Sequence, residues 1–144
     1  MPKIAVDAMG GDAAPRDVID GALAAAGEVD LGVMLVGPTA RLDAEIGRHV
    51  DVDRRRVRIV EAPDVVTMDE SPSAALRRKP GASIRVAAEA VARGEAAGLF
   101  SAGHTGATVM AAHAAFGMLS GVDRPALAAT IPTPSGRAVL LDVG

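Results

Sequence analysis

The chain has 144 residues, a length that fits one modest domain, and 49% of them are hydrophobic, enough for a real core. Only 1% are aromatic, so the core must be built from aliphatic side chains and methionine. The formal net charge of −3 excludes a general attraction to nucleic acid. Cysteine is absent, which excludes a disulfide framework, a thiolate zinc site and a cysteine nucleophile. The sequence shows no signal peptide and no apolar run that could span a bilayer, so we expect a cytoplasmic protein.

Apolar runs and helical patterns alternate along most of the chain. The runs predict strands at 3–6, 31–36, 57–60 and 97–100. The spacing of apolar residues predicts helices at 15–27, 39–47, 71–79 and 83–94, and a further helix after Gly106. Pro15 is expected to be the first residue of its helix, and Ser83 to cap its own. The helix after Gly106 is apolar nearly all round, which predicts burial on more than one side.

Alternating strands and helices predict an α/β fold with a largely parallel sheet covered on both faces. Two further strands are expected at 126–131 and 138–141, joined by a hairpin-type connection at 132–136. Residues 142–144 then follow a strand, which would place them at the edge of the sheet where the sequence stops. We therefore expect a chain that is truncated at its C-terminus.

Two glycine-rich turns follow predicted strands, one at 7–12 and one at 101–106. In the second turn, Gly103 and Gly106 let the backbone approach a ligand closely, and a helix begins there. The unpaired N–H groups and the dipole of a helix N-terminus favour an anion, usually phosphate. Both turns should lie beyond the carboxyl ends of the strands, where ligands bind in such folds. The alternative is a pair of turns that need small residues only for packing.

A longer series of short motifs runs through the whole chain in a definite order. The motifs are 7–12 with Pro15, Arg78-Lys79, 101–103 with 105–107, Gly121 with 123–126, Pro132-Thr133 and 140–144. Together they resemble the N-terminal part of the bacterial phosphate acyltransferases, the acyl-carrier-protein:phosphate acyltransferases of phospholipid synthesis. Any single glycine turn is a weak signal, whereas the ordered series is specific.

The resemblance implies a three-layer α/β/α sandwich related to the isopropylmalate-dehydrogenase-like and phosphotransacetylase folds, assembled as a homodimer. Residues 1–144 would be the N-terminal part of a single acyltransferase domain. A fatty acyl group would move from the carrier-protein thioester to inorganic phosphate, without a cofactor. The acyl phosphate would feed a membrane-bound glycerol-3-phosphate acyltransferase. Any membrane contact of the protein itself would come from outside these residues.

In such a reaction phosphate is the nucleophile, so positioned donors and cations can supply the catalysis. We expect the turn at 101–106 to hold phosphate or the developing oxyanion, with Gly103 and Gly106 allowing the close approach. Ser101 and Thr105 would donate hydroxyl hydrogen bonds. An acylated Ser101 is an alternative, although no His-Asp pattern in the sequence supports it.

In the first turn, Asp7 is expected to orient donors, and Gly10, Gly11 and Asp12 to contact the substrate. A helix cap or turn residue is an equally good interpretation of Asp12. Arg78 and Lys79 would meet phosphate or the phosphopantetheine arm of the carrier.

The arginine cluster at 54–58 could steer the acidic carrier protein to the enzyme, but a solvated surface is the favoured interpretation.

Two positions depart from the family pattern, with His104 in place of asparagine and Ala82 in place of serine. Histidine can become charged near neutral pH, which asparagine cannot. We expect His104 to act as a positioning donor rather than as a general base. A histidine metal site is not expected, because His113 would lie on the opposite helix face and His49 at the surface.

Two other functions remain open at this stage. The chain could be an inactive fragment of the acyltransferase fold, or a phosphate- or nucleotide-binding module that reuses the glycine turns. A dehydrogenase is disfavoured, because neither turn matches G-x-G-x-x-G and no metal-binding carboxylate set is visible.

Overall fold

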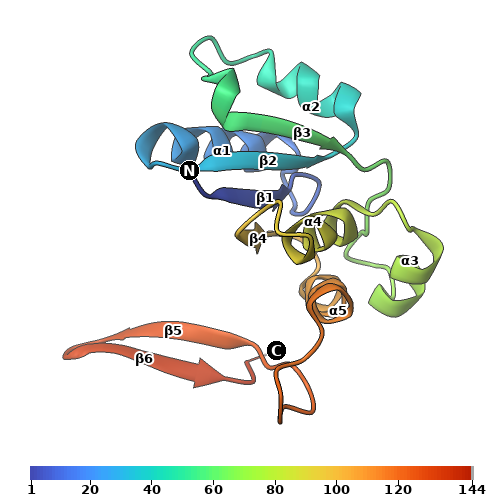
Figure 1. Ribbon diagram of the computed structural model, residues 1–144, viewed down its shortest axis with the longest axis vertical. Coiled ribbons are helices and arrows are strands. Elements are labelled where there is room, and N and C mark those ends of the chain that lie inside the picture. Colours follow the sequence, from blue (N-terminus) through green and yellow to red (C-terminus); the bar gives the residue numbers. More distant parts are fainter. Residues whose placement is uncertain (144) are drawn as a thin grey trace.

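A four-stranded parallel sheet forms the centre of the computed structural model, which describes residues 1–143 (Figure 1). The strand order is β3-β2-β1-β4. The strands are β1 (Lys3–Asp7), β2 (Gly32–Gly37), β3 (Val57–Glu61) and β4 (Gly98–Phe100). Each begins or ends within a few residues of a predicted apolar run, so the α/β class expected from the sequence is confirmed.

Helices connect or follow these strands. They are α1 (Arg16–Glu28), α2 (Thr39–Ile46), α3 (Pro72–Arg78), α4 (Ser83–Ala92) and α5 (Thr105–Phe116), with a 3₁₀ turn at Arg54–Arg56. Pro15 is the N-cap of α1 rather than its first residue, a shift of one position. Gly27 does not end α1, because it does not adopt the positive φ with which glycine stops a helix. Within residues 1–143, no helix has both the length and the apolar character needed to cross a membrane.

The helices lie on both faces of the sheet and produce the expected three-layer α/β/α arrangement (Figure 1). Alternate strand residues point to opposite faces. Val6 and Leu35 pack with Ile19 on the face covered by α1 and α2. Ala5 and Met34 pack on the other face, which α4 covers. The two cores consist of aliphatic and methionine side chains, as the composition requires.

Helix α5 packs on α4 and on α3, and its remaining surface is exposed. Ala107 and Ala111 join Ile84 in a third core cluster, and Leu76 of α3 packs against it. Met110 and Phe116 leave 41% and 50% of their surface exposed. The expectation of burial on more than one side is therefore wrong for the described residues, because no element among them covers the outer face of α5.

The two last strands form the predicted hairpin, but not within the main sheet, and the turn covers only residues 134–135 instead of the predicted 132–136. Strands β5 (Ala128–Thr133) and β6 (Gly136–Leu141) pair antiparallel in a separate sheet that projects from the body (Figure 1). The expectation that the chain stops at the edge of the parallel sheet is therefore wrong for residues 142 and 143. Gly144 lies outside the described residues.

We predict that core and hairpin leucines differ sharply in their effect on stability. Leu42→Ala should lower the free energy of unfolding by about 2–5 kcal/mol, because Leu42 is fully buried between α2 and the sheet. Leu140→Ala removes the same atoms from a side chain that is 52% exposed and should change it by less than about 0.5 kcal/mol. Urea denaturation followed by circular dichroism measures both. Equal losses would show that the hairpin is packed in solution.

Candidate functional site

The strand order brings the two glycine-rich turns side by side. Strand β1 lies between β2 and β4, so the direction in which strands are added reverses between β1 and β4. In their register Val6 is opposite Phe100, which sets Asp7 beside Ser101 at the carboxyl ends of both strands. Ligands of open α/β sheets bind at such a switch point. The turns at 7–12 and 101–106 thus occupy the position where this fold class places its ligand.

The Asp7 carboxylate connects the elements at this point. It is only 4% exposed. Its Oδ1 accepts a hydrogen bond from Ser83 Oγ at 2.6 Å, and its Oδ2 accepts one from Ser101 Oγ at 2.7 Å. The Gly103 N–H donates in turn to Ser101 Oγ at 3.2 Å. A buried carboxylate is costly without hydrogen-bond donors, and the two serines supply them.

Ser83 is therefore not the helix cap that the sequence predicts. It is the first residue of α4, Ala82 is the N-cap, and no side chain caps this helix. The Ser83 hydroxyl instead donates to a residue 76 positions earlier in the chain. Sequence reasoning missed this contact, because a serine near a predicted helix start carries no signal of a distant partner.

Gly10 and Gly103 let the two turns touch. A Cβ on Gly10 would lie 2.5 Å from Asp7 Oδ2 and 2.8 Å from Ser101 Oγ. A Cβ on Gly103 would lie 2.8 Å from the Gly10 Cα. Real Cβ atoms do not approach other heavy atoms so closely. Gly11 has a φ of +126° and lies against Ala102, so it also meets a constraint that favours glycine.

The N-terminus of α5 faces the same region. The helix begins at Thr105, an exposed residue, and its N-cap His104 makes no side-chain capping hydrogen bond. The N–H groups of the first turn therefore have no partner within the helix and carry its positive dipole end. The His104 ring folds back over this turn, with Cε1 3.3 Å from the place of a Cβ on Gly106. This arrangement can bind an anion.

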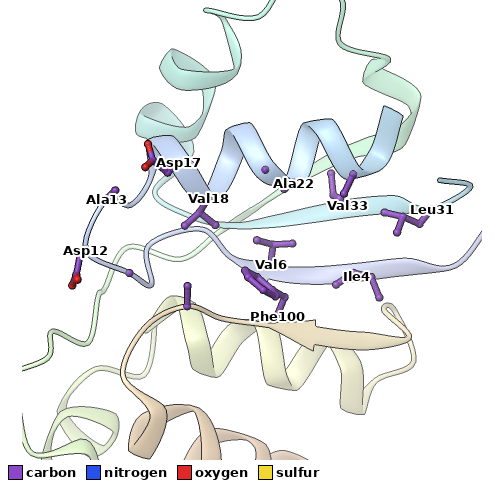
Figure 2. A pocket seen from close by; sticks show the side chains of 14 residues that line it. Ile4, Val6, Asp12, Ala13, Asp17, Val18, Ala22, Leu31, Val33 and Phe100 are labelled. Atoms are coloured by element: carbon purple, nitrogen blue, oxygen red, sulfur yellow. The ribbon is translucent and has the colours of Figure 1, made fainter. Parts of the chain in front are cut away.

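A largely apolar cavity of about 550 Å³ opens beside the turns (Figure 2). Gly11, Asp12 and Ala102 line it where it adjoins them. The remaining wall comes from α1, β1, β2 and β4, including Ile4, Val6, Val18, Ala22, Leu31, Val33 and Phe100. Asp12 is exposed and belongs to the wall of this cavity rather than to the Asp7 network. The apolar cavity thus adjoins both glycine turns.

The structure ties Lys79 to its own segment. Its ammonium donates to Glu70 Oε2 and, at 2.6 Å, to the Val65 carbonyl. Arg78 is exposed, with its guanidinium 3.9 Å from Glu70. Both recorded partners of Lys79 come from the irregular stretch at 63–70, so this lysine holds that stretch against the end of α3.

Three of the four arginines at 54–58 form ion pairs with surface carboxylates. Arg55 bonds Asp53, Arg56 lies 3.6 Å from Asp30, and Arg58 lies 3.2 Å from Glu95. These contacts fit the surface interpretation favoured from the sequence.

No metal site is evident in the described part of the chain. Within residues 1–143, no group of three or more histidine, aspartate or glutamate side chains is arranged to hold a metal ion. His49 forms a 2.9 Å hydrogen bond with Asp20 of α1. Val18, which lines the apolar cavity beside the turns, lies on the opposite side of that helix.

The fold and the site define an α/β protein in which two glycine turns meet beside the N-terminus of helix α5. Comparison with known proteins identifies a family within this class. The family model described as "Fatty acid synthesis protein" matches residues 2–144. The chain belongs to this family.

Several relatives in bacteria carry the name phosphate acyltransferase. The chain is 46% identical to one from Pseudomonas savastanoi pv. phaseolicola, over 99% of this chain and 42% of the relative. It is 49% identical to one from Pelotomaculum thermopropionicum, over 99% of this chain and 41% of the relative. It is 48% identical to one from Desulfitobacterium hafniense, over 100% of this chain and 42% of the relative. The chain thus spans about two fifths of the length of these relatives.

We predict that Gly10→Ala destabilises the protein by about 1–3 kcal/mol, because its methyl group must displace Asp7 or Ser101. Gly21→Ala is the matched control, since a Cβ at this α1 position meets nothing within 4 Å. That change should raise stability by roughly 0.5–1 kcal/mol, because alanine is the better helix former. Urea denaturation of the two variants measures the contrast. A neutral Gly10→Ala would show that the turns are not in contact.

We also predict an acid-sensitive contribution from Glu70. The Lys79 ammonium, helped by the Thr67 N–H, lowers the pKa of this carboxyl from 4.5 to about 2. A lowered pKa stabilises the fold above the unfolded value of 4.5, and this contribution disappears as the pH falls towards 2. The stability difference between wild type and Glu70→Gln should therefore be constant above pH 5 and shrink below about pH 4.5.

Glu28→Gln is the control for that series, since Glu28 is exposed and makes no ion pair among residues 1–143. Its difference from wild type should stay flat over the same range. A Glu70→Gln difference that is equally flat would contradict the ion pair with Lys79.

Proposed function

We propose that this chain is the phosphate-binding N-terminal part of a single acyltransferase domain. The reaction transfers an acyl group from acyl-[acyl-carrier protein] to inorganic phosphate, giving an acyl phosphate for phospholipid biosynthesis. The observation that carries this proposal is the contact of the turns at 7–12 and 101–106 beside the N-terminus of α5. The family membership and the relatives named phosphate acyltransferase support it.

The chemistry needs an anion held against a thioester carbonyl. A phosphate oxygen attacks the carbonyl carbon, the carbonyl oxygen gains negative charge, and the C–S bond then breaks to release the carrier thiol. Holding both reactants in one place lowers the barrier, and N–H donors aimed at the developing charge lower it further. We assign phosphate to the first-turn N–H groups of α5, which lack partners within the helix, and to the exposed Thr105 hydroxyl. His104 is a positioning donor over the same turn.

The apolar cavity beside the turns gives further support. An acyl phosphate joins an anion to a hydrocarbon chain, and the anion site here adjoins a cavity lined by side chains such as Val18 and Phe100. Burial of a hydrocarbon chain contributes about 0.8 kcal/mol per CH₂ group. Arg78 is exposed at the end of α3 and is assigned to phosphate or to the carrier's phosphopantetheine arm.

The remaining partners belong to the same proposal. The exposed apolar side chains of the hairpin, among them Val139, Leu140 and Leu141, and the uncovered face of α5 support a homodimer of the complete protein. The protein would work in the cytoplasm, with an acyl phosphate product that a membrane-bound glycerol-3-phosphate acyltransferase consumes.

A second candidate is a binding module without catalysis. The chain spans 42% of the first of these relatives, so residues needed for the chemical step can lie in the part of the relatives that it does not match. In that case the turns would still bind phosphate or the phosphates of a nucleotide.

We predict that inorganic phosphate shifts the amide NMR signals of Thr105, Gly106 and Ala107 in the 144-residue chain, and that chloride at equal ionic strength does not. Thr105→Val should weaken phosphate binding about threefold to tenfold, because one hydroxyl hydrogen bond is lost. Thr130→Val, an exposed position of the hairpin, is the matched control and should bind as wild type does. Shifts confined to other residues would overturn the proposed site.

Incubation with acyl-[acyl-carrier protein], phosphate and hydroxylamine tests the transfer itself. Phosphate-dependent acyl hydroxamate supports acyl transfer by this chain. Intact thioester alongside phosphate binding supports the binding module, and tight nucleotide binding without transfer extends that function to nucleotides. Parallel initial-rate lines would indicate an acyl-enzyme at Ser101.

A further inference from the structure

Ser83 is the one member of the Asp7 network that does not belong to either glycine turn. It is 2% exposed and stands at the first position of α4. Its hydroxyl makes no capping bond to its own helix and donates to Asp7 Oδ1 at 2.6 Å. A buried hydroxyl needs an acceptor for its hydrogen, and Asp7 Oδ1 is that acceptor here.

The hydrogen bonds of Ser101 show what depends on Asp7. A serine hydroxyl has one proton to donate. Ser101 gives its proton to Asp7 Oδ2 and accepts the Gly103 N–H, so it has no second proton for a bound anion. In this arrangement Ser101 shapes the turn rather than donating to phosphate. Its orientation depends on Asp7 Oδ2, and Ser83 occupies the other oxygen of the same carboxylate.

We propose that Ser83 is a positioning residue of the anion site, acting through Asp7 and Ser101 on the turn at 101–106. With Oδ1 held by Ser83, the carboxylate keeps Oδ2 directed at Ser101, and Ser101 Oγ keeps the Gly103 N–H turned inward. The backbone of the turn is thereby set before the anion arrives. This inference rests on the proposed function, since it assigns Ser83 to the same phosphate site.

The surroundings of Ser83 support a link to the site. A small cavity of about 10 Å³ is lined by Asp7 and Ser83 together with His104 and Thr108 at the start of α5. Ser83 and the start of α5 therefore border the same small space. Losing the Ser83 hydroxyl frees Asp7 Oδ1 next to that cavity and loosens the carboxylate that orients Ser101.

The test is phosphate binding by the 144-residue chain, measured by NMR titration, in a double-mutant cycle. Ser83→Ala should weaken phosphate binding about tenfold, or about 1.4 kcal/mol. It should also shift the Gly103 amide signal in the absence of phosphate. In a Ser101→Ala background, where the Asp7 bond no longer reaches the turn, Ser83→Ala should change phosphate binding by less than twofold.

A merely structural role for Ser83 would give the same loss in both backgrounds, and that result would overturn the inference. So would wild-type affinity in Ser83→Ala. Ile46→Val, a mild core change under α2, controls for general loosening and should keep wild-type affinity. Where Ser83→Ala does not fold, Ser83→Cys keeps the side-chain size while weakening the donor, and the same cycle applies. Absence of phosphate binding in the wild type would instead remove the proposed function.

Discussion

The rest of this site depends on the hydrogen bonds of the buried Asp7 carboxylate. The carboxylate accepts hydrogen bonds from the hydroxyls of Ser83 and Ser101, 76 and 94 positions away, and so joins the end of β1 to the start of α4 and the end of β4. A charge in a low-dielectric interior is tolerated only with such donors, so the three segments must meet at one geometry. The N-terminus of α4 adds a favourable dipole at the same place. The Asp7 carboxylate thereby holds the turns that follow β1 and β4 in one position relative to each other.

Glycine makes that meeting possible without adding a contact of its own. Gly10 and Gly103 approach so closely that neither can carry a Cβ while Asp7 and Ser101 keep their bond. The first turn of α5 begins directly after this contact, and its N–H groups have no partner within the helix. Residues that would be phosphate ligands by type, such as Lys79, are engaged elsewhere. The proposed phosphate site therefore relies on backbone N–H groups and the Thr105 hydroxyl.

Much of the candidate site was visible as two glycine turns, but its internal roles were not. The sequence predicts that Ser101 donates a hydrogen bond to phosphate, whereas in the structure its hydroxyl donates to Asp7. Ser83 reads as a helix cap, yet Ala82 holds that position. In each case the residue type predicts a hydrogen bond, while the partner depends on which distant segment packs alongside. The same limit explains why α5 is less buried than predicted and why the hairpin lies outside the main sheet. An apolar pattern predicts burial but does not say which element covers the apolar side chains.

The sequence by itself determined the alternating elements, the positions of the turns and the membership of an acyltransferase-like family, because periodicity, glycine placement and motif order are local properties of the chain. Tertiary structure alone decided that β4 pairs with β1 rather than with β3. That choice brings Asp7 beside Ser101 and creates the switch point. Strand order is set by how helices α1, α2 and α4 pack their apolar faces on the sheet, a balance over the whole core that no short stretch of sequence contains.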